Sequence, residues 1–120
     1  MAVKLNQRAF NHAEKLIEDG RFVYDDRDDW SEHRPSADAE NRFIEAHGFR
    51  EYAKWHLGID DDANEHTKNH YKFPYGDFED VHRCALLSAE SRAGQYKHSD
   101  IERATAHLHG MVEAAAKIKH

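Results

Sequence analysis

The chain has 120 residues, 39% of them hydrophobic and 33% charged, and a formal net charge of -6 at pH 7. That length and composition fit one folded domain and exclude a chain that is disordered throughout. The absence of an apolar run of about 18 residues excludes a membrane span. With no secretion signal pattern and a single cysteine, Cys84, we expect one soluble, cytoplasmic, bacterial-type domain over residues 1–120.

The first half of the chain predicts three helices. Apolar residues recur at helical spacing over residues 5–17, and Gly20 follows as a natural stop. Ser36 is placed to cap a second helix, which ends at Gly48. The stretch FREYAKWHLG then predicts a short helix that stops at Gly58.

The second half predicts two longer helices. Asp77 is placed to cap a helix that runs to about Gly94, and the pattern Ser-x-x-Glu at residues 99–102 is typical of a capping box before the last helix. Residues 60–70 predict a flexible acidic and polar loop, and residues 21–24 are taken as extended, since an isolated strand of four residues has little stability. The predicted fold is all-α, a compact domain of about five helices with a C-terminal helical hairpin.

Aromatic residues concentrate in one stretch, HYKFPYGDFEDVHR. Four of the 13 aromatic residues of the chain lie between Tyr71 and Phe78. We expect Tyr71, Phe73 and Phe78 to close the end of the core. The alternative is that Tyr75 and a neighbour line a recognition surface, because exposed aromatic residues gather at binding patches.

Several blocks of the sequence resemble a family of small, uncharacterised bacterial proteins. The blocks are DDRDDWSEH, ENRFIEAHGFREYAKWHLGID, YKFPYGDFEDVHRCALLSAESRAGQYKH and DIERATAHLHGM. The resemblance covers nearly the whole chain but implies no activity, ligand or catalytic residue. More weakly, the pattern YKFPYGDF…VHR…SRA is similar to short helical segments in phage head-maturation proteins.

The 11 histidines raise the possibility of a metal site, because a transition metal needs three or four ligands that converge on one point. The metal candidates on spacing are His66 with His70, four residues apart, and His107 with His109. The second pair flanks Leu108 on a predicted helix, where residues two apart point in different directions. We therefore expect most histidines to lie at the surface, and no cofactor is predicted, although a transition metal stays an alternative.

The acidic stretches DDRDD and IDDDANE favour solvated loops over a calcium site. Seven acids lie between Asp25 and Glu40, against two arginines. The second stretch fails the EF-hand pattern, because Glu65 stands where glycine is needed and Tyr71 stands where glutamate is needed.

An enzyme is disfavoured, because the usual catalytic patterns are missing. His82 and Cys84 lie two apart on a predicted helix and should face apart, so a Cys–His pair is not expected. Cys84 is interpreted as a small core residue. The sequence has no glycine-rich phosphate loop and no Gly-x-Ser-x-Gly elbow.

The leading hypothesis is a small helical protein that acts by protein–protein binding, with a homodimer as the expected assembly and no membrane partner. The candidate binding surface consists of Trp30, Trp55, Tyr71, Phe73, Tyr75, His82, Arg83, Arg92, Tyr96 and Lys97. The first alternative is a histidine-based metal-binding protein with a storage or hydrolytic role. The second is a weak binder of nucleic acid or nucleotides through Arg83, Arg92 and Lys97, disfavoured for nucleic acid because the chain has no basic run.

Overall fold

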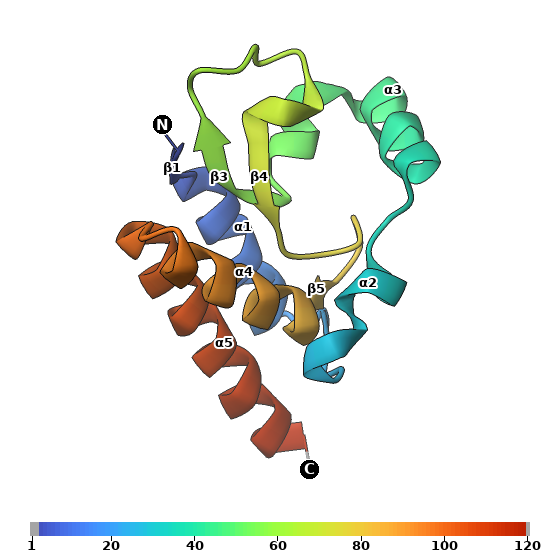
Figure 1. The fold of residues 1–120 in the computed structure, drawn as a ribbon. Helices are drawn as coiled ribbons and strands as arrows, with labels where there is room; N and C mark the ends of the chain where they lie inside the picture. The colour runs from blue at the N-terminus through green and yellow to red at the C-terminus, as the bar shows by residue number, and fades with distance from the viewer. Residues whose placement is uncertain (1–2, 120) are drawn as a thin grey trace.

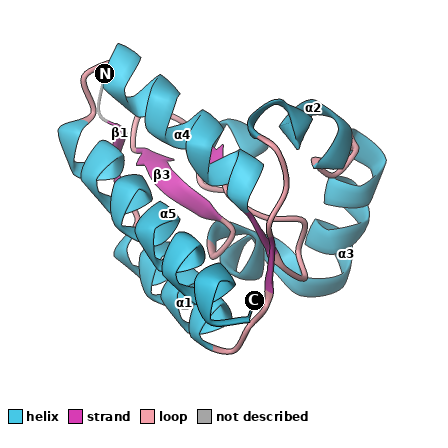
Figure 2. Ribbon diagram, turned by 90° about the horizontal axis from the view of Figure 1, so that it is seen from below, coloured by secondary structure: helices cyan, strands magenta, loops and turns pink. Residues whose placement is uncertain are grey.

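The computed structural model describes residues 3–119 (Figure 1). Its five α-helices are α1 (Gln7–Glu18), α2 (Trp30–His33), α3 (Ala37–Ala53), α4 (Arg83–Gln95) and α5 (Ser99–Lys119). Two short 3₁₀ helices, η1 (Arg27–Asp29) and η2 (Lys68–His70), precede α2 and the fourth strand. Figure 2 shows α1, α4 and α5 grouped on one side of the molecule, with α2 and α3 on the other.

In the described part of the chain, five short strands form two sheets. The strands are β1 (Val3–Leu5), β2 (Phe22–Val23), β3 (His56–Asp60), β4 (Tyr71–Pro74) and β5 (Val81–His82). The larger sheet is antiparallel in the order β1-β3-β4, with Lys4 opposite Ile59 and Gly58 opposite Lys72. The smaller sheet is a parallel pair in which Val23 of β2 lies opposite His82 of β5.

The all-α prediction was therefore wrong, and the chain has a mixed α/β fold. The stretch FREYAKWHLG is not one helix: α3 ends at Ala53, and His56 begins a strand. Each strand has five residues or fewer, too short for a clear alternation of polar and apolar residues. Their pairing joins distant parts of the chain, such as Val3 with Asp60, and no local pattern reports such a contact.

Several helix ends confirm the expectations from capping and glycine. Gly20 adopts a left-handed conformation (φ 79°) after α1, and the amides of Gly20 and Arg21 donate to the carbonyls of Ile17 and Leu16. This is the Schellman arrangement, which glycine favours because it has no Cβ. Ser36 caps α3 by accepting a hydrogen bond from the amide of Ala39.

Two other helix boundaries differ from those predicted from the sequence. Gly48 leaves helical geometry (φ 84°), so α3 consists of two helical pieces joined at the residue where the first was expected to stop. Asp77 does not cap α4, which begins only at Arg83. Asp77 Oδ1 instead accepts hydrogen bonds from the amides of Glu79 and Asp80. These bonds form a turn that leads the chain into β5.

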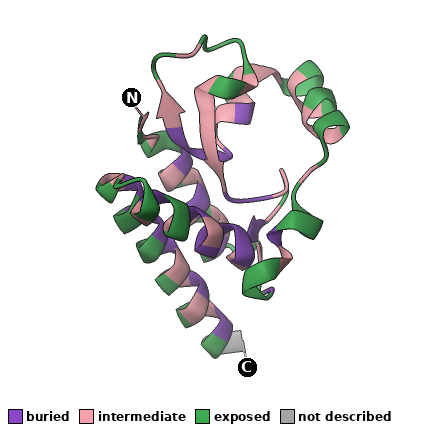
Figure 3. Cartoon of the chain, viewed as in Figure 1, coloured by how far each residue is buried: buried purple, intermediate pink, exposed green. Residues whose placement is uncertain are grey.

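The core lies between α1, α4, α5 and β3. Figure 3 shows buried residues along α4 and on parts of α1 and α5. The largest fully buried side chains include Tyr75, Leu57, Leu86, Ile101 and Leu108. α4 contacts α5, η1, α2 and β4, and Cys84, Ala85 and Leu86 in its first turn are buried. Within residues 3–119, no helix combines the length and apolar character needed to cross a membrane.

Candidate metal centre

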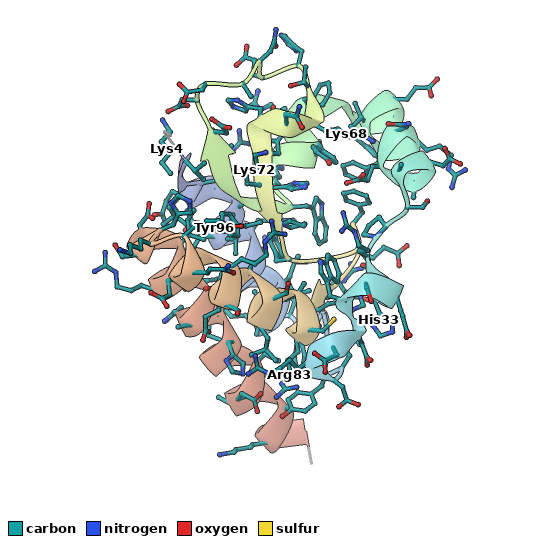
Figure 4. All side chains as sticks on the ribbon, in the orientation of Figure 1. Lys4, His33, Lys68, Lys72, Arg83 and Tyr96 are labelled. Atoms are coloured by element: carbon teal, nitrogen blue, oxygen red, sulfur yellow. The ribbon has the colours of Figure 1, made fainter. Side chains whose placement is uncertain are left out.

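Four side chains of metal-binding types converge beside the start of α4. They are Asp25, His33, His82 and Cys84, and one potential ligand atom of each lies within 4.8 Å of all the others. Asp25, His82 and Cys84 are buried, whereas His33 is exposed at the C-terminal end of α2. Figure 4 labels His33 on α2 and Arg83, which begins the helix that carries Cys84.

The local structure explains how Asp25 reaches this position. It follows β2, and the parallel pairing of β2 with β5 places the chain after β2 beside the start of α4. The Arg83 guanidinium donates to the Asp25 carbonyl at 2.9 Å, and the Cys84 amide donates to Asp25 Oδ1 at 2.7 Å. An amide in the first turn of a helix has no hydrogen-bond partner within the helix. The Asp25 carboxylate accepts a hydrogen bond from one such amide, and the positive end of the helix dipole stabilises its negative charge.

The second carboxylate oxygen, Asp25 Oδ2, is the centre of the cluster. It lies 2.7 Å from His82 Nδ1, 2.8 Å from His33 Nδ1 and 3.1 Å from the Cys84 sulfur. Burial raises the pKa of Asp25, but the hydrogen bonds from His82, Cys84 and His33 outweigh that effect and lower the pKa to about 2. Asp25 is therefore an anion that faces three donors.

His82 is held from both sides by carboxylates. Its Nδ1 faces Asp25, while its Nε2 lies 2.9 Å from Asp77 Oδ2. Burial alone would lower the pKa of His82, but the hydrogen bonds to Asp77 and Asp25 raise it. Asp77 thus fixes the ring with Nε2 as a donor and directs Nδ1 into the cluster.

Cys84 is a protonated thiol in this arrangement. Burial, together with the adjacent Asp25 carboxylate, raises the pKa of the Cys84 thiol well above its usual value. A nucleophilic cysteine requires the opposite shift, so the surroundings disfavour nucleophilic catalysis. A bound metal ion would reverse this effect, because coordination deprotonates a thiol.

An aromatic wall closes the cluster on one side. The buried Trp30 ring packs with Cys84 and Ala85, and its centroid lies 5.8 Å from that of His82. The cluster is therefore shielded from water except near His33, whose side chain is 36% exposed.

The four histidines selected by spacing lie elsewhere. His66 is exposed, and His70 Nδ1 contacts the carbonyl of Ala63. His107 contacts Glu14, while His109 contacts Glu113. Among residues 3–119, none of these four belongs to a group of three or more candidate ligands.

The candidate binding-surface residues are divided between the interior and the surface. Trp30, Trp55, Tyr75 and His82 are buried; Tyr71, Phe73 and Arg83 are partly exposed; Arg92, Tyr96 and Lys97 are exposed. The aromatic stretch thus mostly serves the core: the Phe78 ring stacks on Phe43 and the Tyr75 ring on Trp55. Three of the six aromatic candidates are therefore buried, while Tyr71, Phe73 and Tyr96 stay at least partly exposed, and the protein-binding hypothesis stays a prediction.

Sequence reasoning missed the cluster for two identifiable reasons. His82 and Cys84 were expected to face apart on one helix, but His82 has extended backbone (φ -107°, ψ 126°) and belongs to β5, so both side chains reach Asp25. Asp25 and His33 were assigned to a solvated acidic loop. The only available signal was the close spacing of His82 and Cys84, because Asp25 precedes them by 57 and 59 positions.

Comparison with family models, with curated proteins and with solved structures finds no match to this chain. The resemblance to uncharacterised bacterial proteins therefore stays an expectation, and the functional argument depends on the geometry of the cluster.

Proposed function

We propose that this protein binds one divalent transition metal ion, with Zn²⁺ as the best fit, through Asp25, His33, His82 and Cys84. The observation that carries the proposal is the convergence of four ligand atoms from three separate segments of the chain within 4.8 Å. Carboxylate oxygen, imidazole nitrogen and cysteine sulfur are the ligands that Zn²⁺ uses in proteins.

The distances suit a small tetrahedral ion. Zinc bonds of about 2.0–2.3 Å separate neighbouring ligand atoms by roughly 3.3–3.8 Å in a tetrahedron. The contacts of Asp25 Oδ2 with its three partners are 2.7 to 3.1 Å long, so each must lengthen by only roughly half an ångström. The other ligand atoms lie within 4.8 Å of one another, and those beyond tetrahedral spacing would move closer together on binding the ion.

The charges also balance. The carboxylate of Asp25 and the thiolate of Cys84 together carry two negative charges, which a divalent ion neutralises while both histidines bind as neutral rings. Burial of a neutral metal complex costs much less than burial of unpaired charges. The ion takes the place of the protons that the Cys84 thiol and the histidine Nδ1 atoms share with Asp25.

The surroundings of His82 support the same conclusion. Histidines that bind zinc usually donate their other ring N–H to a carboxylate or carbonyl, which fixes the tautomer and orients the ring. Asp77 lies in that position, 2.9 Å from His82 Nε2. Its place is independent of the four candidate ligands, because the turn at residues 77–80 holds it.

Four protein ligands favour a structural role over a hydrolytic one. A catalytic zinc ion usually keeps one position open for water, whereas structural sites are closed by the protein. The ion would fasten the segment that carries Asp25 and His33 to β5 and α4. This role differs from the storage or hydrolytic alternatives expected from the sequence.

The test is metal content and its dependence on Cys84. Untagged protein, treated with a chelator and then incubated with Zn²⁺, should retain about one ion per chain by elemental analysis. Co²⁺ should give the absorption of a cobalt–thiolate bond. Cys84→Ser should abolish that absorption and lower the zinc affinity, whereas His66→Ala, an exposed histidine outside the cluster, should match the wild type.

The proposal is abandoned if chelator-treated wild-type protein retains no stoichiometric Zn²⁺ or Co²⁺. It is equally abandoned if Cys84→Ser, with an unchanged circular dichroism spectrum, shows the same cobalt spectrum as the wild type. In either case the cluster is a hydrogen-bonded network that holds the start of α4.

A further inference from the structure

A second feature beside the candidate metal centre is an arginine-lined pocket. Its volume is about 350 Å³, within the usual range for small-molecule sites. Three of the nine arginines in the chain line it: Arg27 from η1, Arg34 from the end of α2 and Arg92 from the last turn of α4. None of the four candidate metal ligands lines the pocket, although Trp30 borders both sites.

These arginines differ from the paired arginines of the same chain. Arg21 and Arg83 form ion pairs with Asp80 and Glu113. Within the described residues, no ion pair with an acid is found for Arg27, Arg34 or Arg92. Among residues 3–119, Asp28 is the only acid that lines the pocket. The pocket therefore carries an excess of positive charge in a protein whose net charge is -6.

The rest of the lining combines hydroxyl groups with apolar side chains. Ser31 and Ser88 provide donors, while Trp30, Phe73 and Pro74 provide the apolar surface. Phe73 has a positive φ of 60°, a conformation that non-glycine residues adopt only when surrounding contacts hold them there. Such strained residues gather at ligand sites, where they orient a side chain.

We propose that this pocket binds a small organic phosphate that carries a flat ring, the chemical class of a nucleoside monophosphate. Guanidinium groups bind phosphate oxygens in pairs of parallel hydrogen bonds, and three of them can contact one phosphate from different sides. Phe73 and Pro74, both partly exposed, offer an apolar surface against which the ring can pack. Phosphate is favoured over carboxylate because a dianion satisfies three cations more completely.

The position of this pocket changes the site expected from the sequence. The nucleotide-binding hypothesis drawn from the sequence used Arg83, Arg92 and Lys97. Arg83 instead donates to Glu113 at 2.6 Å and lies over the Tyr24 ring, and Lys97 does not line the pocket. Arg92 alone is retained, and Arg27 and Arg34 take the place of the other two.

The experiment is calorimetric titration at low ionic strength with AMP, adenosine and inorganic phosphate. AMP should bind at one site, adenosine at least about tenfold more weakly, and inorganic phosphate should compete with AMP. Arg34→Gln and Arg92→Gln should each weaken AMP binding about tenfold or more, as the loss of a charge-assisted hydrogen-bonded pair predicts. Arg103→Gln makes the same change of charge at an exposed position of α5 and should bind as the wild type does.

Two results would overturn this proposal: no AMP binding to the wild type, or equal losses in Arg103→Gln and in the two pocket variants. The first would show that the pocket is not a phosphate site, and the second that the arginines act only through net charge. The titration is run on both chelator-treated and zinc-loaded protein, because Arg27, Trp30 and Arg34 lie on or next to the segment that the ion would fasten. Loss of AMP binding in both forms counts against the pocket itself, whatever the outcome of the zinc test.

Discussion

At the scale of single residues, Tyr75 shows why an aromatic stretch occurs in so polar a chain. Its side chain is fully buried, and its ring stacks on Trp55 at 5.5 Å between centroids. The hydroxyl donates to the carbonyl of Lys54 at 2.7 Å and lies 2.8 Å from His12 Nδ1. Since its one hydrogen goes to Lys54, the hydroxyl oxygen accepts from His12. One residue thus joins α1, the end of α3 and the turn before β5.

Replacing Tyr75 by Phe should lower the free energy of unfolding by about 1–3 kcal/mol, because two partly buried polar groups lose their partner while the ring remains. Urea denaturation measures the change. Tyr71→Phe is the matched control, because the Tyr71 hydroxyl donates to the backbone carbonyl of Glu65 in an exposed connection. Its free energy of unfolding should change by no more than about 0.5 kcal/mol. Equal losses in the two variants would contradict this account of Tyr75.

At the scale of elements, the turn that follows Tyr75 depends on a residue without a side chain. A Cβ on Gly76 would lie 2.5 Å from the carbonyl oxygen of Asp80 and 2.6 Å from the Trp55 ring. The backbone is held there by pairing, since Gly76 bridges Val81 and the Asp77 amide donates to Asp80. Position 76 requires glycine because the Asp80 carbonyl and the Trp55 ring lie too close for a Cβ. A positive φ is not the reason, since the φ of Gly76 is not positive.

Gly76→Ala should therefore destabilise the protein by about 1–3 kcal/mol, the usual cost of forcing atoms into a packed site. Gly110→Ala provides the contrast, because a Cβ there meets nothing within 4 Å and the position is exposed on α5. Alanine favours helix over glycine by up to about 1 kcal/mol, so this variant should be more stable than the wild type. Thermal unfolding should move the two midpoints in opposite directions, and a shift in the same direction would refute the argument.

At the scale of the whole molecule, burial of histidine links stability to pH. His56 lies in β3, and its Nδ1 donates to the carbonyl of Tyr52. Burial lowers the pKa of His56 from 6.5 to about 4, and the Tyr52 carbonyl and the Glu40 carboxylate oppose this only in part. Below pH 6.5 the unfolded chain therefore binds a proton at His56 that the folded protein excludes until about pH 4.

The free energy of unfolding should consequently fall as the pH decreases from 6.5 to 4, with a contribution of about 3 kcal/mol from His56. His56→Asn retains a donor for Tyr52 but does not titrate, so its stability should depend less steeply on pH in this range. His66→Asn, at an exposed position, should keep the wild-type slope. Urea denaturation of chelator-treated protein at several pH values gives the comparison, and parallel curves for His56→Asn and wild type would disprove the assignment.

Local sequence patterns were sufficient for several helices and their ends. The stop at Gly20, the cap at Ser36 and the break at Gly48 depend on interactions within a few residues, and a helix boundary was predicted at each from residue type. The start of α4 was misplaced because Asp77 uses its carboxylate in a turn and toward His82. A side chain suited to a cap is also suited to a turn, and only tertiary contacts distinguish the two uses.

The sequence by itself determined the helical character of most of the chain and the lack of a disulfide within it, since these follow from residue type and short-range spacing. Tertiary structure alone decided the two sheets, the candidate metal centre and the arginine-lined pocket. In each case residues far apart in the chain meet, as Asp25 meets Cys84 across 59 positions. Such meetings depend on how strands pair and helices pack, and the free energy of that packing is shared among many residues, so no short motif records it.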